Sequence, residues 1–187
     1  MSALVTLSVL WRVMLVSLAL TQGGCASVSY YTQAVSGHLE VMGAARDVLT
    51  VIASTPDQDL RLRLEQALAM RAFATTELGL PDNDSYTSYA DLQRPFVVWN
   101  VVATPALSLQ PKTWCFLVVG CLAYRGYYEE ASARAQAASL RAAGFDVSVG
   151  GVRAYSTLGW FDDPLLNTML APPPPYLQGV MFHELAH

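Results

Sequence analysis

The sequence predicts an α+β fold, in which an N-terminal helical hairpin is followed by a small, mainly antiparallel sheet and a C-terminal helix. Between residues 31 and 79, apolar residues recur every three or four positions, as they do on one face of a helix. Between residues 96 and 156, β-branched and aromatic residues form short runs that are typical of strands. The chain has 187 residues, 53% of them hydrophobic, so it can bury a core within one domain.

Two helices are expected in the N-terminal half. The apolar spacing predicts one continuous helix over Tyr31–Ala53. A second helix is expected to begin with Thr55 as its N-cap, Pro56 at the first helical position and Gln58 closing a capping box. Gly79 ends this helix. The short connection predicts an antiparallel helical hairpin.

The predicted strands lie in the middle of the chain. Phe96–Ala103 is β-branched and aromatic and predicts a strand, and Trp114–Tyr124 predicts a second strand or a hairpin. The alanine-rich segment Glu129–Ala143 predicts a helix that ends at Gly144.

A hairpin is expected after that helix. Phe145–Val149 and Val152–Ser156 are two alternating runs separated by Gly150-Gly151, a pattern that predicts two strands with a two-glycine turn. The phenol of Tyr155 could stabilise an oxyanion, but packing in the core is the simpler interpretation.

Two further polar positions are candidates for a site. Asp162 and Asp163 could bind a substrate amine or a metal ion, but an Asp before a Pro is more simply the N-cap of a short helix that runs to Met169. His38 stands beside Glu40 on the first predicted helix and is interpreted as a surface residue.

The last five residues form a His-Glu-x-x-His motif, with His183, Glu184 and His187 at its fixed positions. Residues four apart lie one turn above each other on a helix, so the two histidines can bind one zinc ion. Glu184 can then hold the metal-bound water as general base. Structural coincidence in an apolar helix is the alternative, and it is disfavoured because the chain has only 3 His.

The position of the motif leads to a further expectation. A catalytic zinc usually takes three protein ligands and a water, and no residue follows His187 in this sequence to supply the third. We therefore expect these 187 residues to be the N-terminal part of a longer zinc peptidase, and to be inactive and to bind zinc weakly as they stand. The competing hypothesis is a non-catalytic envelope lipoprotein with a structural or decayed motif helix.

The first 25 residues are expected to be an export signal. An apolar stretch, Leu4–Leu20, carries the single charge of Arg12 and is followed by Gly23-Gly24-Cys25. This arrangement is typical of a bacterial lipobox, in which Cys25 is lipidated and becomes the mature N-terminus. An uncleaved membrane anchor and ordinary secretion are the alternatives. All three place the remaining domain, residues 29–187, outside the cytoplasm. The lipoprotein and the uncleaved anchor would hold it at the membrane, on the periplasmic side of the cell envelope, through the lipid or the N-terminal segment.

Cys115 and Cys121 leave two alternatives open. On one extended strand their Cα atoms would be about 20 Å apart at roughly 3.3 Å per residue, far beyond disulfide reach. They can pair only if residues 118–120 turn the chain back, and otherwise they are two buried thiols. Their spacing does not fit a zinc knuckle.

Net charge excludes one class of partner. The chain has a formal net charge of −4 and contains no basic stretch, so nucleic acid is not an expected partner.

Several segments together resemble a family of predicted bacterial aminopeptidases. They are Tyr30-Tyr31-x-Gln33-Ala34, Leu78–Asn83, Pro95–Ala103, Trp114-Cys115-Phe116, Gly120-Cys121, Tyr124–Tyr127 and Gly150–Leu165. The resemblance implies a zinc metallopeptidase of the glutamate-zincin type, which acts on peptides and is often a lipoprotein. It places the metal ligands at His183 and His187 and the catalytic glutamate at Glu184. Peptidases of this broad type often bind substrate as an added strand, so it also implies a substrate edge strand over Ala154, Tyr155, Ser156 and Thr157.

Overall fold

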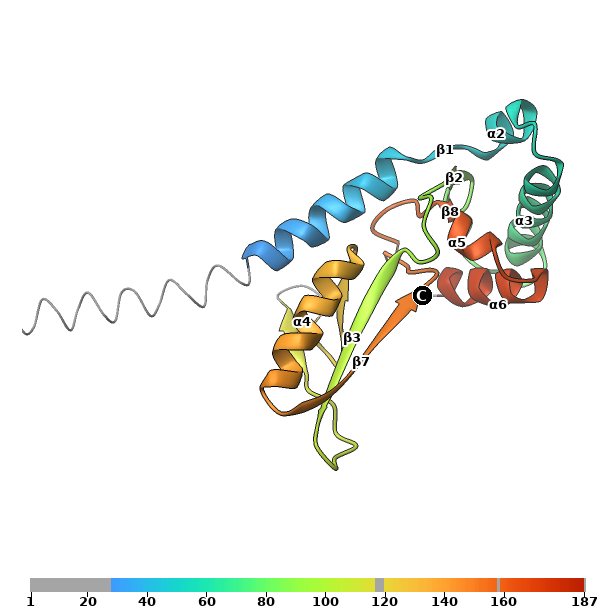
Figure 1. Cartoon of the computed structure of the whole chain (residues 1–187). Helices are drawn as coiled ribbons and strands as arrows, with labels where there is room; N and C mark the ends of the chain where they lie inside the picture. Colours follow the sequence, from blue (N-terminus) through green and yellow to red (C-terminus); the bar gives the residue numbers. More distant parts are fainter. Residues whose placement is uncertain (1–27, 117–119, 158, 187) are drawn as a thin grey trace, which may run out of the picture. The chain divides into compact units, whose positions relative to one another are not determined.

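The computed structural model describes residues 28–116, 120–157 and 159–186 (Figure 1). The chain divides into two units, residues 1–37 and 38–187, and the second unit contains every element labelled in Figure 1. The predicted export segment with Cys25 lies outside the described residues, and so does His187. No helix in the described part has the length and apolar character that a membrane span requires.

The prediction of one helix over Tyr31–Ala53 is wrong. A helix over residues 28–43 ends before the short strand β1 (Arg46–Asp47), and α2 (Val48–Ser54) begins after it. The break is stabilised by a contact distant in sequence, because β1 pairs with β2 (Ser88–Ala90). Locally, the side chain of Asp47 caps α2 by accepting from the backbone N–H of Thr50.

The second helix, α3 (Gln58–Thr76), forms the expected pair with α2, but the predicted cap is wrong. Asp57 is the N-cap, and its carboxylate accepts from the backbone N–H groups of Asp59 and Leu60. Thr55 ends α2 instead, and its hydroxyl accepts from the N–H of Asp57. The negative charge of the Asp57 carboxylate also interacts favourably with the helix dipole. The uncharged hydroxyl of a threonine cap would lack this interaction.

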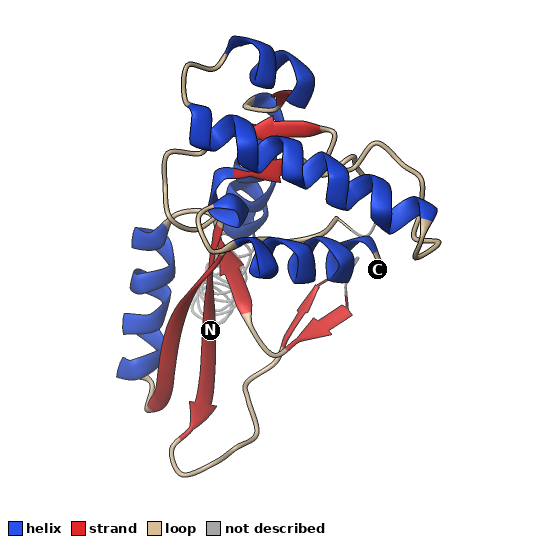
Figure 2. Cartoon of the chain, turned by 90° about the vertical axis from the view of Figure 1, so that its right-hand side faces the viewer, coloured by secondary structure: helices blue, strands red, loops and turns tan. Residues whose placement is uncertain are grey.

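Residues from the middle of the chain form a three-stranded antiparallel sheet. Its strand order is β6 (Arg125–Tyr127), β3 (Val98–Pro105), β7 (Phe145–Val152). Strand β3 confirms the strand predicted over Phe96–Ala103. Helix α4 (Glu130–Ala142) confirms the predicted alanine-rich helix, and Gly144 follows it at φ +87°. Helix α4 packs along β3 and β7 (Figures 1 and 2). It buries Ala133, Ala137 and Leu140, whose spacing puts them on one face.

The predicted hairpin at Gly150-Gly151 is wrong. Both glycines lie inside the continuous strand β7, opposite Asn100 and Trp99 of β3. Residues 154–157 follow in a loop, so the predicted substrate edge strand over Ala154, Tyr155, Ser156 and Thr157 is not formed. A glycine inside a strand often marks the close approach of another group, and here the ring of Phe96 occupies the space beside Gly151.

Cys115 and Cys121 form a disulfide. They are directly opposite each other in the hairpin of β4 (Trp114–Phe116) and β5 (Gly120–Leu122). Of the two alternatives left open by the sequence, the structure therefore has the paired one, and both cysteines are exposed.

The core lies between the helices and a second three-stranded sheet, β1-β2-β8, in which β8 is Leu165–Leu166. After β8 come α5 (Asn167–Leu170) and the motif helix α6 (Pro174–Leu185), which packs against α3 (Figure 2). The largest fully buried side chains include Leu64, Leu165, Met169 and Met181. The predicted α+β class is confirmed.

Candidate active site

The motif helix α6 presents different faces to the core and to solvent. It begins within a run of prolines, at Pro174, and proline suits the first helical turn because it has no N–H to leave unpaired. Leu177, Met181 and Leu185, spaced four apart, are buried. Glu184 is half-buried and His183 is exposed. The helix therefore holds Glu184 at the border between the core and the surface.

Glu184 lines a cavity of about 250 Å³. Three segments that are distant in the sequence form its walls, namely the loop after α3, the loop after β7 and the end of α6. The other lining residues are Pro81, Asn83, Ser85, Tyr86, Ser156, Gly159, Asp163 and Leu185.

Asp163 connects two of these segments. Its Oδ2 accepts from the backbone N–H of Thr157 at 2.7 Å and from the Thr157 hydroxyl at 3.1 Å. Its carbonyl accepts from the N–H of Tyr86 at 2.7 Å, and its own N–H donates to the hydroxyl of Ser85 at 3.3 Å. The predicted N-cap role is wrong, because α5 begins only at Asn167, after β8.

Arg71 of α3 fixes the loop after α3, which forms one wall of the cavity. Its buried guanidinium donates to the carbonyls of Ser85 at 3.0 Å, Pro81 at 3.2 Å and Asn83 at 2.5 Å. One side chain thus satisfies several backbone acceptors of the loop that carries Tyr86.

The ionisable groups of the cavity are perturbed by burial. Asp163 is only 5% exposed, and burial raises the pKa of its carboxyl, while the hydrogen bonds from Thr157 act in the opposite direction. Burial also raises the pKa of Tyr86, and the nearby carboxylates of Asp163 and Glu184 raise it further. The Tyr86 phenol therefore stays protonated at neutral pH and remains a hydrogen-bond donor.

The structure brings together some of the residues that the sequence singled out and separates others. Glu184, Asp163 and Ser156 line one cavity, whereas Tyr155 does not line it. The Tyr155 hydroxyl lies 3.0 Å from Nδ1 of His38, and the ring packs against the core. The interpretation of His38 as a surface residue is wrong, since its Nε2 is buried and its ring lies 4.7 Å from that of Phe161.

Metal donors are described only in part. His183 is exposed beside Glu184, and His187 lies outside the described residues. Within the described ranges, no group of three His, Cys, Asp or Glu side chains is placed to hold a metal ion. The imidazole of His183 is a suitable zinc donor on a helix, so the donor chemistry fits the metal that the motif predicts.

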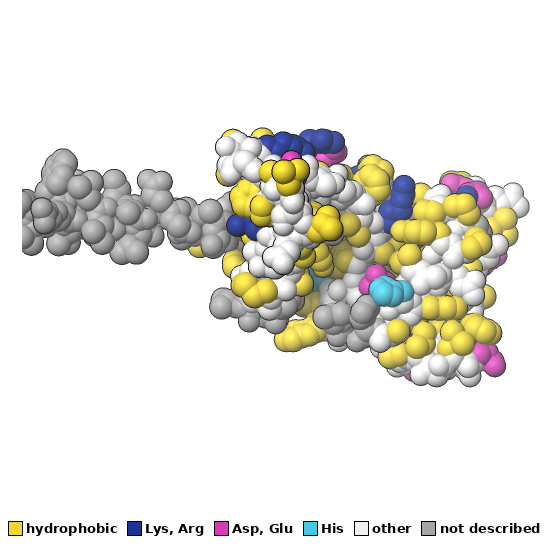
Figure 3. Space-filling view, turned by 90° about the horizontal axis from the view of Figure 1, so that it is seen from below, with side chains coloured by type: hydrophobic (Ala, Val, Ile, Leu, Met, Phe, Trp, Pro, Cys, Tyr) yellow, Lys and Arg dark blue, Asp and Glu magenta, His cyan; other side chains and the backbone are white. Residues whose placement is uncertain are grey.

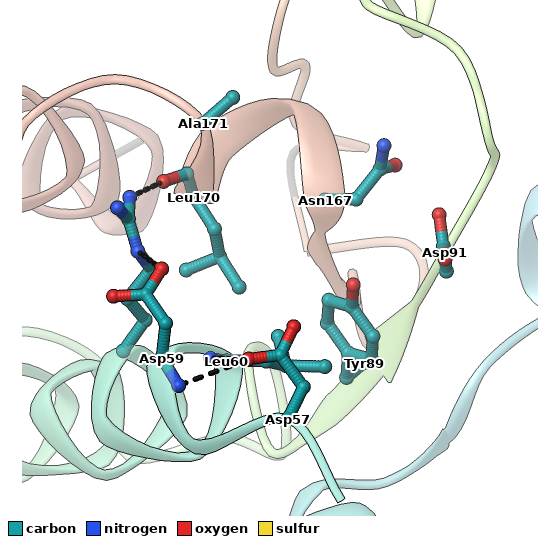
Figure 4. Close-up of a pocket in the computed structure, with 9 residues that line it drawn as sticks. Asp57, Asp59, Leu60, Tyr89, Asp91, Asn167, Leu170 and Ala171 are labelled. Carbon is teal, nitrogen blue, oxygen red and sulfur yellow. Dashed lines mark hydrogen bonds and ion pairs between the residues drawn. The ribbon is translucent and has the colours of Figure 1, made fainter. Parts of the chain in front are cut away.

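A second, more open pocket of about 360 Å³ lies between α3, α5 and the segment after β2 (Figure 4). Its carboxylates already have structural partners. Asp57 caps α3, Asp59 forms an ion pair with Arg63 at 2.8 Å, and Asp91 accepts from the N–H of Gln93. Arg63 in turn donates to the carbonyl of Leu170 at 2.6 Å. This pocket contains none of the predicted site residues.

On the face drawn in Figure 3, apolar side chains are widely spread, and the described Lys and Arg side chains occur in small separate groups.

No sequence pattern indicates that Tyr86, Ser85 or Arg71 belong to the site. Tyr86 has a φ of +66°, a conformation that a bulky residue adopts only when its surroundings impose it. Tyr86 follows a polar, turn-rich segment, whose composition carries no signal for a buried phenol. Arg71 lies in an amphipathic helix, where arginine is ordinarily a solvated side chain.

Comparison with known proteins gives a single finding. Residues 29–187 match the model of a protein family described as "putative aminopeptidase". Neither the curated proteins nor the solved structures provided a match.

Proposed function

Because the chain belongs to the putative aminopeptidase family, we propose that the protein is a zinc-dependent peptidase that removes amino-terminal residues from peptides. One observation supports this most strongly. Glu184, the glutamate of the His-Glu-x-x-His motif, lines a cavity together with Asp163 and Tyr86, on a helix whose opposite face is fixed in the core.

In this proposal, His183 and His187 are two of the three protein ligands that a catalytic zinc site usually has. When bound, zinc would supply an activated water at neutral pH, since it lowers the pKa of a bound water toward about 7. The family match supports peptidase activity, and the metal is proposed from the motif.

Glu184 would act as the general base. Its carboxylate accepts a proton from the attacking water and then donates it to the amine that leaves as the peptide bond breaks. Tyr86, which stays protonated, would donate a hydrogen bond to the oxyanion that forms on the scissile carbonyl.

The metal dependence of peptide hydrolysis tests this proposal. The protein, expressed from its full reading frame, is treated with a chelator and assayed on a short peptide with a free amino terminus, before and after zinc is returned. We expect hydrolysis to disappear and to recover with about one zinc per chain. Chelator-resistant hydrolysis, or no hydrolysis with any divalent metal, would contradict the proposal.

We also propose that the domain works in the bacterial cell envelope, attached to the membrane through a lipid on Cys25. The segment Leu4–Leu20 and the small residues before Cys25 support export. The exposed disulfide between Cys115 and Cys121 is consistent with it, because such bonds persist in oxidising compartments outside the cytoplasm.

A further inference from the structure

Among the described residues, one oxygen of the Asp163 carboxylate has no hydrogen-bond partner. Oδ2 accepts from Thr157, but Oδ1 is shielded from solvent and accepts from none of the described residues. A buried carboxylate oxygen without a donor destabilises the ionised group, and atoms of this kind in native proteins are associated with strain, with catalytic roles or with a bound water or ion.

The surroundings of this oxygen favour a positive charge. The residues that line the cavity include two carboxylates, Asp163 and Glu184, and among the described ones no Lys, Arg or His. Asp162 and His38 lie outside this lining, and their effects on the pKa of Asp163 oppose each other. The net effect in this cavity is attraction of a small cation.

The cavity is also small. Pockets for drug-sized ligands have volumes of about 300–1,000 Å³, whereas this one has about 250 Å³. It can therefore take a single amino-acid residue more readily than an internal stretch of polypeptide.

We propose that Asp163 binds the α-ammonium group of the substrate's first residue and thereby restricts the enzyme to peptides with a free amino terminus. This inference rests on the proposed function and adds the residue that recognises the substrate. An ammonium group offers three donors and a full positive charge, so it satisfies Oδ1 and compensates for the burial of the carboxylate. An acylated amino terminus carries no positive charge, and the cavity has too little space for the added acyl group.

The carboxylate is preorganised for this role. Two hydrogen bonds from Thr157 fix its side chain, and backbone bonds to Tyr86 and Ser85 fix its main chain. Because these groups are already ordered, binding of the ammonium does not require the site to lose further conformational freedom.

Binding of a small ligand tests the inference without turnover. The protein carrying Glu184→Gln is titrated calorimetrically with L-leucinamide and with N-acetyl-L-leucinamide, with and without Asp163→Asn. We expect leucinamide to bind at least tenfold more tightly than its acetylated form, and Asp163→Asn to weaken leucinamide about 10- to 100-fold and to remove the preference.

Asp162→Asn is the matched control, because it removes the same charge from an exposed neighbouring side chain. It should leave the preference for leucinamide unchanged. Circular dichroism and thermal unfolding establish that Asp163→Asn is folded, and Thr157→Val, which removes one hydrogen bond but keeps the charge, should retain most of the affinity.

The outcomes separate this inference from the proposed function. Unchanged leucinamide affinity in Asp163→Asn, or equal binding of the acetylated ligand, overturns the inference even if peptides are hydrolysed. Loss of zinc binding in Asp163→Asn also overturns it, because Asp163 would then be a metal ligand. If no peptide is hydrolysed but leucinamide binds through Asp163, the inference holds and the proposed chemistry fails.

Discussion

The aromatic ring of Phe96 occupies the space in front of Gly151, so that a Cβ added to Gly151 would be 2.3 Å from the ring atoms. Gly151 of β7 pairs with Trp99 of β3, and the guanidinium of Arg153, just after β7, lies 4.9 Å from the centre of the Phe96 ring. The glycine is therefore required by a packing contact with Phe96, which precedes β3, and not by a turn.

Gly151→Ala should lower the free energy of unfolding by about 1–3 kcal/mol, because the added methyl group forces Phe96 out of its position. Gly150→Ala is the matched control, since a Cβ at Gly150 meets nothing within 4 Å. Its effect should stay within about 0.5 kcal/mol. Urea denaturation of the two variants measures the difference, and equal stabilities would contradict the packing argument.

Asp163 should make folding pH-dependent in a defined direction. Burial raises the pKa of its carboxyl in the folded state above the ordinary value of 3.8. The folded chain therefore holds this proton to a higher pH than the unfolded chain, so the contribution is most favourable below pH 3.8 and is lost as the pH rises through the folded-state pKa.

Asp163→Asn should remove that decline of the unfolding free energy with rising pH, and Asp162→Asn should retain it. Urea denaturation measured across this pH interval makes the comparison. A decline of the same size in Asp163→Asn and in the unmodified protein would show that Asp163 is not its source.

Tyr86→Phe should lower kcat about 100-fold with little change in KM, because the hydroxyl is proposed to act on the oxyanion, which forms only in the transition state. Tyr155→Phe is the control, since Tyr155 does not line the cavity and its hydroxyl contacts His38 and Tyr128 instead. Steady-state kinetics on one peptide substrate give both values. Comparable kcat losses in the two variants would argue against a specific role for Tyr86.

Cys25 should be the lipidated N-terminus of the mature protein, as its position after Gly23-Gly24 predicts. Mass spectrometry of the protein isolated from the membrane fraction should detect no peptide from residues 1–24 and an added lipid mass on Cys25. An intact N-terminal segment, or an unmodified Cys25, would contradict this prediction.

The elements that the sequence predicted correctly are those that local patterns determine. The β-branched run around Val98 and the alanine-rich helix before Gly144 each contain their own signal. The break before Val48 does not, because its partner is β2, about 40 residues further along the chain. The strand through Gly151 was mistaken for a turn for the same reason, since the contact with Phe96 is visible only in the folded chain.

In the candidate site too, residues with a local sequence signal could be predicted, and residues brought in by distant contacts could not. Glu184 could be predicted because the spacing of the motif on a helix has a direct chemical meaning. Asp163 was considered but assigned to a helix cap, since an Asp before a Pro more often has that role. Tyr86 and Arg71 enter the site only through the folding of the loop after α3, where a guanidinium binds backbone carbonyls.

The kinetic effect of Glu184→Gln, measured together with the zinc content, tests the central claim most directly. Glutamine keeps the size of the side chain but cannot accept a proton, so kcat/KM on a peptide with a free amino terminus should fall at least about 100-fold while zinc per chain stays the same. Glu65→Gln, at an exposed position of α3, should change neither value. A Glu184→Gln protein that retains full activity would show that the cavity at the end of α6 is not the site of peptide hydrolysis.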